Sequence, residues 1–312
     1  MNSKIIHQIN KVVMGEILFD EPMKNHTTFG IGGPASCFVH PQDTNDLINL
    51  LKLAYEQNLP VFFIGSGSNI LVSDDGFDGI VISLKKNFSN LEITKTGEIS
   101  AESGVLLGHL VNQAINAGLK GMENLAGIPG TVGGAIKMNA SAYGYEISRE
   151  FISAEVISMS GERKSYSSKD ISFSYRHSTF NENEIIISTK FKCKFGSQTR
   201  IKYQKQKVSE KRRASQPLGV RSAGSIFKNP PHSPAGYLID KANFKGIKHG
   251  GAEISTKHAN FIINNNNASS EDVIHLISKI QNVVSDNDNI KLELEIKLLG
   301  FSNDIMEKLK YV

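Results

Sequence analysis

The segment 121–144, GMENLAGIPGTVGGAIKMNASAYG, contains six glycines, one proline and two charged side chains. This composition suits neither a regular helix nor a regular strand, so we expect the segment to consist mostly of turns. Its apolar residues Leu125, Ile128, Val132, Ile136 and Met138 distinguish it from a flexible linker and predict that it is packed into the protein. Glycines let a ligand approach the backbone closely, and successive backbone N–H groups bind anions. The segment therefore predicts a rigid phosphate-binding loop.

A second glycine-rich turn lies in residues 61–84. The pattern there predicts a buried strand, VFFI, then the turn Gly-Ser-Gly-Ser-Asn at 65–69, an acidic turn and another strand. Two such loops favour a large diphosphate cofactor, although both could be tight turns of a β-rich domain. Ile70 stands where a dinucleotide fingerprint has its third glycine, and the chain has no P-loop motif, so neither of these nucleotide folds is supported.

Length and composition are typical of an ordinary soluble protein. Its 312 residues, 39% of them hydrophobic, predict about two domains with proper cores. The amino terminus lacks the pattern of a signal peptide and no apolar run approaches ~18 residues, so we expect a cytoplasmic protein that does not bind membranes. Cys37 and Cys193 are far apart and predicted to be small buried residues, and the histidine spacing favours no metal site.

The formal net charge is +4, which suits an anionic ligand without requiring nucleic acid. The strongest charge run is 200–213, with seven Lys or Arg against one Glu. Ile201, Gln204 and Val208 form a helical stripe in it, which favours a helix with a solvated basic face at a domain junction. Tyr203 is its lone aromatic residue, so we expect no nucleic-acid partner.

Hydrophobic periodicity predicts an α+β protein. Amphipathic helices are expected over 43–58, which Asp43 or Thr44 begins, and over about 105–117, which Gly118 ends. Later elements are predicted from the same signals: strands at 154–159, 162–167, 184–195, 258–264 and 289–300, and helices at 234–244 and 269–284.

Eight motifs follow one another between about residues 20 and 300: TTFGIGGPA, FIGSGSNIL, the glycine-rich segment above, SYRHS, GSIFKNP, AGYLID, STKHANFIIN and LELEIKLLG. In this order they resemble the UDP-N-acetylenolpyruvoylglucosamine reductase (MurB) family. The resemblance implies a flavoenzyme of peptidoglycan precursor synthesis, and so a part in cell-wall biogenesis, cell shape and cell division. It would use NADPH and FAD to reduce UDP-N-acetylglucosamine enolpyruvate to UDP-N-acetylmuramate.

The resemblance also implies the architecture: an FAD-binding domain of the vanillyl-alcohol-oxidase (PCMH) type in two lobes, plus a smaller α+β substrate-binding domain. We expect the first domain over 1–199, with lobes of about 1–60 and 61–199, and the second over 200–312, in a monomer. The residues expected to hold FAD without a covalent bond are Gly65, Ser66, Gly67, Ser68, Asn69, Gly127, Ile128, Pro129, Gly130, Thr131, Gly133, Gly134, Asn139 and Ala140.

The chain departs from the family pattern at several positions, among them Asn243 and Asn266, near which the family commonly has a glycine. Ser141 replaces a glycine in the string Asn139–Gly144, and SDNDN at 285–289 replaces an aromatic-glycine turn before the last strand. The short course from Arg176 to Phe195 leaves little room for a tyrosine-bearing insertion, so the chain resembles the shorter type of the family.

The expected reaction needs a hydride on one alkene carbon, stabilisation of the enolate and a proton on the other carbon. Arg176, after Tyr175, can pair with the substrate carboxylate through its planar guanidinium, and the family implies a catalytic role for it. By resemblance Ser225 is the proton donor, and Tyr175, Lys228 and Asn229 bind substrate. Periodicity predicts a solvated face for Glu293 and Glu295 alike, and only the resemblance selects Glu295 as the residue that stabilises the enolic intermediate.

From the residues alone, purely structural roles stay open: Arg176 could form a surface salt bridge, and Ser225 could be a turn serine hydrogen-bonded to its own backbone. Two other classes also remain. A flavin oxidase of the same fold would often tether its flavin through His or Cys, and neither glycine loop contains one. A non-redox nucleotide-sugar-binding protein would not need Arg176, Ser225 and Glu295 together.

Overall fold

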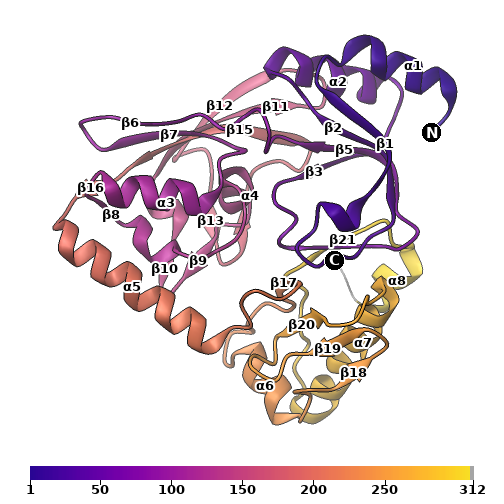
Figure 1. The fold of residues 1–312 in the computed structure, drawn as a ribbon, viewed down its shortest axis with the longest axis vertical. Helices are drawn as coiled ribbons and strands as arrows, with labels where there is room; N and C mark the ends of the chain where they lie inside the picture. The colour runs from indigo at the N-terminus through magenta and orange to yellow at the C-terminus, as the bar shows by residue number, and fades with distance from the viewer. Residues whose placement is uncertain (310–312) are drawn as a thin grey trace. The chain divides into compact units, whose positions relative to one another are not determined.

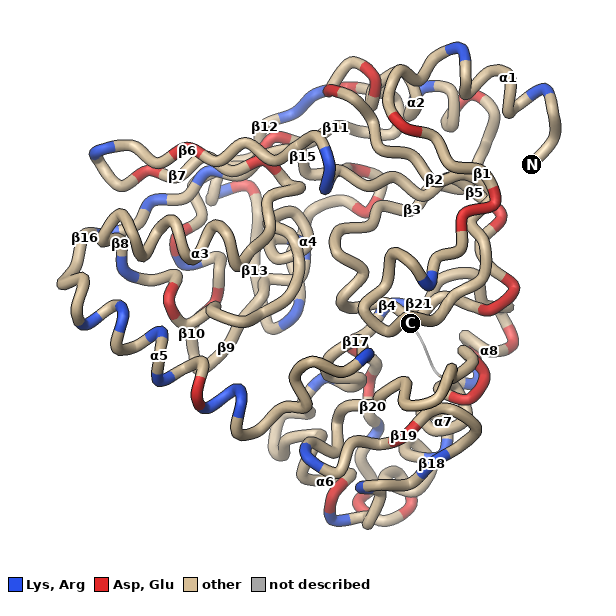
Figure 2. The backbone as a smooth tube through the Cα atoms, in the orientation of Figure 1, with Lys and Arg blue, Asp and Glu red and all other residues tan. Residues whose placement is uncertain are grey.

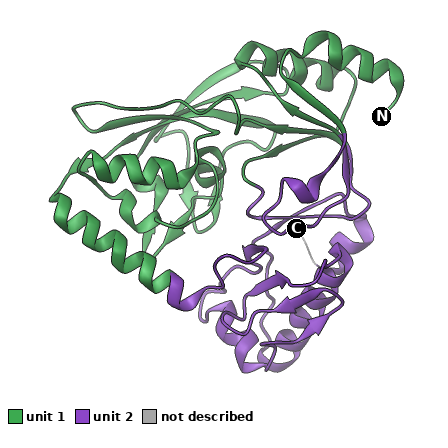
Figure 3. Ribbon diagram, in the orientation of Figure 1, with its two compact units in different colours: residues 1–19, 37–66, 79–212 green, residues 20–36, 67–78, 213–312 purple. Residues whose placement is uncertain are grey.

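The computed structural model describes residues 1–309, in which helices and strands are interleaved along the whole chain (Figure 1). Two compact units are built from discontinuous segments (Figure 3). Unit 1 comprises residues 1–19, 37–66 and 79–212, and unit 2 comprises 20–36, 67–78 and 213–312. These packing units differ in bounds from the two domains predicted from the sequence, and the assignment of cofactor and substrate binding to 1–199 and 200–312 stays a prediction.

The larger sheet of unit 1 is antiparallel, with the strand order β12-β11-β15-β7-β6. Its strands are β12 (Arg163–Ser167), β11 (Phe151–Ser158), β15 (Glu184–Lys192), β7 (Glu98–Glu102) and β6 (Leu91–Ile93). Helices α3 (Leu107–Asn116) and α4 (Val132–Lys137) share one hydrophobic core with it. The strands and the helix predicted in this region are thereby confirmed.

A second sheet has the order β1-β2-β5-β3, formed by β1 (Glu16–Pro22), β2 (Pro34–His40), β5 (Phe77–Ser83) and β3 (Val61–Ile64). Helices α1 (Ser3–Val12) and α2 (Thr44–Glu56) pack with its unit 1 residues in another core. Helix α2 begins where predicted, because the Asp43 side chain accepts hydrogen bonds from the N–H groups of Asn45 and Asp46. Cys37 and Cys193 are buried free thiols, as expected, and burial raises the pKa of each to about 12.

Short elements fill the rest of unit 1. They are β8 (Leu119–Lys120), η2 (Met122–Leu125), β9 (Ser141–Ala142), β10 (Tyr145–Glu146), η3 (Ile147–Glu150), β13 (Phe173–Ser174), β14 (His177–Ser178) and β16 (Lys194–Phe195). Helix α5 (Gln198–Ser215) carries the basic run, and Figure 2 shows the Lys and Arg positions along it. Ile201 and Val208 of its predicted stripe are buried.

Unit 2 contains the antiparallel sheet β17-β20-β19-β18, made of β17 (Ser222–Ser225), β20 (Phe261–Asn264), β19 (Ala252–Ile254) and β18 (Lys248–His249). Helices α6 (Ala235–Lys241) and α7 (Ser270–Asp288) share its core. A parallel pair joins β4 (Ile70–Val72) to β21 (Lys297–Leu299). The short elements η1 (Met23–Asn25) and α8 (Asn303–Lys308) complete the unit. Within residues 1–309 no helix has the length and apolar character that crossing a membrane demands.

Two expectations are corrected. The segment 121–144 was expected to lack a regular helix, which is wrong: α4 forms there, with the Thr131 hydroxyl accepting the N–H of Gly134 at 3.5 Å and with Val132 and Ile136 fully buried. The strand expected over 289–300 is regular only at 297–299, although burial alternates along it as predicted. Before it, α7 continues to Asp288 and ends at Asn289, whose φ is +54°.

Candidate active site

The two glycine loops meet inside unit 1. A Cβ atom built on Gly65 would lie 2.5 Å from the Thr131 hydroxyl oxygen, and one on Gly133 would lie 2.8 Å from Cβ and Oγ of Ser103. Both distances are shorter than real Cβ contacts, so neither position accepts a side chain without movement. At Gly65, in the loop after β3, and at Gly133, at the start of α4, the backbone therefore packs directly against a neighbouring side chain, and only glycine fits there without movement of that neighbour.

Backbone conformation sets the course of the same loops. Gly127 and Gly130 have φ values of +81° and +138°, a region that L side chains rarely adopt. Gly67, which belongs to unit 2, has φ +61°, and a Cβ there would lie 2.0 Å from the carbonyl oxygen of His26. The glycines are thus required by geometry at these turns, as the phosphate-loop interpretation expects.

Polar groups of the loops are also buried. Asn139 is fully buried at φ +43°, and its amide donates to the carbonyl oxygen of Ser174 at 2.9 Å. Within residues 1–309, the Asn139 Oδ1 atom and the Ser66 Oγ atom are buried and have no hydrogen-bond partner. Unpaired buried polar atoms are uncommon in proteins, and a bound group that completes the site is one explanation for them. The cradle of glycines and these atoms fit a bound FAD, which the loop residues named above would hold.

Arg176 lies in the turn between β13 and β14, at the end of the predicted strand FSY. Its φ is +56°, an uncommon conformation for a residue with a side chain and one that tends to persist at functional sites. Its Nη1 atom donates to the Ser141 hydroxyl at 2.7 Å, and its guanidinium carbon lies 5.3 Å from the centroid of the Tyr175 ring. Arg176 is thus oriented by the hydroxyl of Ser141, a hydrogen-bond partner that a glycine at this position would not supply.

Arg212 is a functional candidate that the sequence analysis missed, because it was assigned to the solvated face of the basic helix. Its Nε atom is buried, and its Cδ lies 3.0 Å from the position of a Cβ on Gly127. Burial lowers the pKa of Arg212, Tyr143 partly offsets the effect, and the like charge of Arg176 adds to it. The signal was available: Arg212 follows Val208 by four residues and so extends the buried stripe of α5 by one turn.

Unit 2 brings together Asn69, Ser225 and Glu295. The Glu295 N–H donates to the carbonyl oxygen of Ile226, next to Ser225, at 2.8 Å. The Asn69 side chain donates to the carbonyl oxygen of Glu295 at 3.0 Å, and the Lys297 N–H donates to that of Asn69 at 2.9 Å. The segments around residues 69, 226 and 295 thus form one hydrogen-bonded ladder.

Burial separates the two glutamates that periodicity could not. The Glu293 side chain is 70% exposed and pairs with Lys228, Nζ to Oε2, at 3.3 Å. Glu295 is half-buried. The Asn229 side-chain oxygen accepts the N–H of Ala235 at 3.0 Å, just where α6 begins. Lys228 and Asn229 therefore lie on the same ladder as Ser225 and Glu295.

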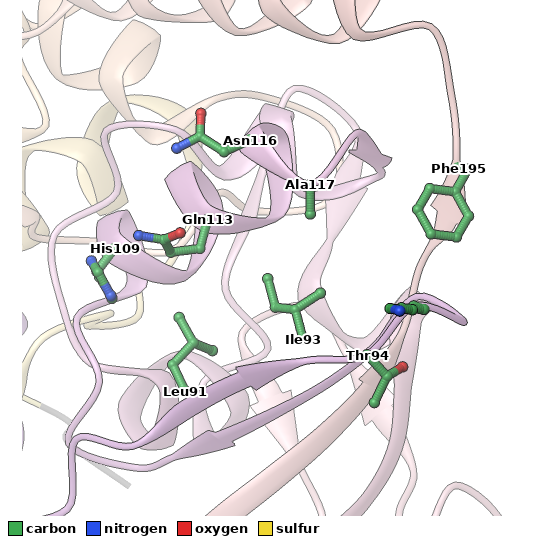
Figure 4. Close-up of a pocket in the computed structure, with 9 residues that line it drawn as sticks. Leu91, Ile93, Thr94, His109, Gln113, Asn116, Ala117 and Phe195 are labelled. Carbon is green, nitrogen blue, oxygen red and sulfur yellow. The ribbon is translucent and has the colours of Figure 1, made fainter.

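A shallow groove elsewhere in unit 1 encloses about 670 Å³ between α3 and the β6–β7 hairpin. Leu91 and Ile93 of β6 face His109 and Gln113 of α3 across it, with Phe195 at one end (Figure 4). None of its lining residues is a predicted site residue. No cluster of His, Cys, Asp or Glu suited to a metal ion is found in the described part of the chain. The groove therefore contains none of the candidate functional residues.

Comparison with known proteins now gives these features a context. An FAD-binding domain model matches residues 35–167, and the model of the UDP-N-acetylenolpyruvoylglucosamine reductase C-terminal domain matches 216–299. The UDP-N-acetylenolpyruvoylglucosamine reductase of Carboxydothermus hydrogenoformans is 43% identical, over 96% of this chain and 99% of that protein. That of Clostridioides difficile is 39% identical, over 95% and 97%. The crystal structure of MurB from Thermus caldophilus matches with a TM-score of 0.79 and 34% identity, over 91% of this chain and 98% of that one.

The fold, the glycine loops and the first of these matches define an FAD-binding flavoprotein of α+β class, as the sequence predicted. The chain belongs to the UDP-N-acetylenolpyruvoylglucosamine reductase family. The roles of individual site residues are not tested by these similarities and remain proposals.

Proposed function

We propose that this chain reduces UDP-N-acetylglucosamine enolpyruvate to UDP-N-acetylmuramate in peptidoglycan precursor synthesis, and that Arg176, Ser225 and Glu295 carry the reaction. Membership of the reductase family supports the overall reaction. The observation that carries the residue assignment is the ladder in unit 2, which holds the backbone of Glu295 against the residue that follows Ser225.

When bound and reduced by NADPH, FAD would supply the hydride for one alkene carbon of the substrate. Negative charge then develops on the substrate as an enolate conjugated with its carboxylate. Arg176 offers a planar guanidinium to this charge, and its hydrogen bond to Ser141 fixes one edge of that plane. Ser225 donates the proton to the other alkene carbon, and the resulting serine alkoxide is reprotonated by solvent. Glu295, half-buried beside this segment, stabilises the enolic intermediate.

The loop residues Gly65–Asn69, Gly127–Thr131, Gly133, Gly134, Asn139 and Ala140 are the groups we assign to FAD, without a covalent bond. Tyr175, Lys228 and Asn229 are assigned to the substrate. The Lys228 ammonium pairs at 3.3 Å with Glu293, whose side chain is 70% exposed, and an anionic group of the substrate can replace so exposed a partner. We further infer a monomer that works in the cytoplasm on this small molecule and binds neither membrane nor nucleic acid; the modest net charge of +4 supports the last point.

The experiment that tests the assignment separates the two half-reactions. Ser225→Ala should leave flavin reduction by NADPH near the wild-type rate, because that step protonates no substrate carbon. Reoxidation by the enolpyruvyl substrate should fall by about 10² to 10⁴-fold, the usual contribution of a general acid. Ser222→Ala is the matched control, since Ser222 lies in the same strand, β17, three residues earlier. Unchanged reoxidation in Ser225→Ala would remove Ser225 from the proton transfer.

A further inference from the structure

The chain beyond Ser225 is held by an unusual partner. Strand β20 begins at Phe261, which pairs with Ser225, so the backbone of Phe227 has no pairing partner within β20. The side chain of Asn260 takes that place: its Nδ2 donates to the carbonyl oxygen of Phe227 at 2.8 Å, and its Oδ1 accepts the N–H of Phe227 at 2.9 Å. Asn260 is 3% exposed and Phe227 is 1% exposed. One amide thus satisfies both buried backbone groups of Phe227 as a neighbouring strand would.

The opposite edge of the same segment is fixed by the ladder described above. The carbonyl oxygen of Ile226 accepts the N–H of Glu295 at 2.8 Å, and the N–H of Lys228 donates to the carbonyl oxygen of Glu293 at 2.9 Å. The Ile226 N–H donates to the backbone carbonyl of Asn260 at 2.9 Å. Residues 226–228 are therefore clamped between Asn260 and the strand that bears Glu295.

On the N-terminal side of Ser225, strand β17 is irregular. Gly224 has φ +77°, and no atom lies within 4 Å of a Cβ built on it. Ser225 itself pairs with Phe261 only after a register shift in β17. Ser225 is therefore held directly by its pairing with Phe261 and, on its C-terminal side, by the clamp on residues 226–228 in which Asn260 takes part.

We propose that Asn260 is a positioning residue for proton transfer, which holds Ser225 in register with Glu295 through the backbone of residues 226–228. This inference rests on the proposed role of Ser225 as the acid. If the clamp is lost, Phe227 retains two unpaired buried backbone groups, and the segment must move to reach other partners. A displacement of about 1 Å at a reacting group costs on the order of 10²-fold in rate.

Asn260→Ala should therefore keep flavin bound and reduce it at the wild-type rate with NADPH, while reoxidation by the enolpyruvyl substrate slows about 10²-fold. Asn260→Asp should fall between Asn260→Ala and wild type, because burial against the carbonyl oxygen of Phe227 keeps the new carboxyl group protonated, and a protonated carboxyl can accept the N–H of Phe227 and donate to its carbonyl oxygen. This milder variant also serves where the alanine variant fails to fold.

The matched control is Asn264→Ala. Asn264 is also in β20, and its amide likewise bridges two backbone groups, donating to the carbonyl oxygen of Phe29 at 3.0 Å and accepting the N–H of Ala268 at 2.9 Å. Its removal should lower stability in the same way without changing reoxidation. Equal slowing in both asparagine variants, or slowing of both half-reactions in Asn260→Asp, would reduce Asn260 to a structural residue and overturn the proposal.

A double-mutant cycle distinguishes a failure of this proposal from a failure of the acid assignment. Because Asn260 acts through Ser225, removing both side chains should slow reoxidation little more than Ser225→Ala alone. Multiplication of the two effects would show that Asn260 works independently and would overturn the inference. Slowing in Asn260→Ala with normal reoxidation in Ser225→Ala would instead remove the acid assignment, and with it this inference.

Discussion

Replacing Gly65 with alanine tests the contact between the two glycine loops, on which the cofactor site depends. The new Cβ would lie 2.5 Å from the Thr131 hydroxyl oxygen, which can rotate away only by giving up its 3.5 Å contact with the N–H of Gly134 at the start of α4. Overpacking of this kind typically costs about 1–3 kcal/mol. We therefore expect Gly65→Ala to lower the free energy of unfolding by that amount, measured by urea titration at a fixed excess of FAD, and to weaken FAD binding.

Two further variants make the reasoning refutable. Gly108→Ala is the control: a Cβ on Gly108 meets no atom within 4 Å, so this change in α3 should be neutral or slightly stabilising. Thr131→Ala removes Oγ1 and Cγ2, at 2.5 and 3.4 Å from the new Cβ, and leaves the Cβ of residue 131 at 3.5 Å. In the Thr131→Ala background, Gly65→Ala should therefore lower the free energy of unfolding by at least about 1 kcal/mol less than it does in the wild type. Additive effects of Gly65→Ala and Thr131→Ala, or an equal loss in Gly108→Ala, would refute the close approach of the loops.

Two other outcomes are expected. Arg176→Lys keeps the charge but loses the planar fork of the guanidinium, so turnover should fall by about 10² to 10³-fold with flavin still bound. The control is Arg149→Lys, which should turn over normally; the guanidinium carbon of Arg149 lies 5.2 Å from the Tyr145 ring centroid in a similar stack. A wild-type rate in Arg176→Lys would contradict the assignment. Burial, with a smaller effect of Lys245, lowers the pKa of His258 below 6.5 in the folded state. The unfolded chain therefore binds the proton more readily, and the free energy of unfolding should decline as the pH falls below about 6.5. His258→Gln should flatten that decline, and identical pH profiles of the two proteins would contradict the prediction.

Local signals were sufficient for much of the fold. Helix α2 could be predicted because its cap, Asp43, and its apolar stripe are both local. Helix α4 could not, because six residues with two glycines have little helical tendency of their own, and the helix forms where Thr131 caps it and Val132 and Ile136 are buried.

The candidate site divides in the same way. Glycine content predicted the loops, since each conformation depends on its own residue. The difference between Glu293 and Glu295, the burial of Arg212 and the clamp by Asn260 depend on partners far along the chain: Asn69 and Glu295 are 226 positions apart, and Asn260 and Phe227 are 33 apart. No periodicity within a single strand or helix encodes such contacts.

The most direct test of the central claim is the anaerobic flavin spectrum of the purified protein during two successive additions. We expect a yellow protein whose FAD is released on denaturation, whose flavin absorbance is lost on addition of NADPH, and whose absorbance returns on addition of one equivalent of UDP-N-acetylglucosamine enolpyruvate. A colourless protein, or reduced flavin that oxygen reoxidises rapidly while the enolpyruvyl substrate leaves it unchanged, would contradict the assignment of this chain as a reductase of that substrate.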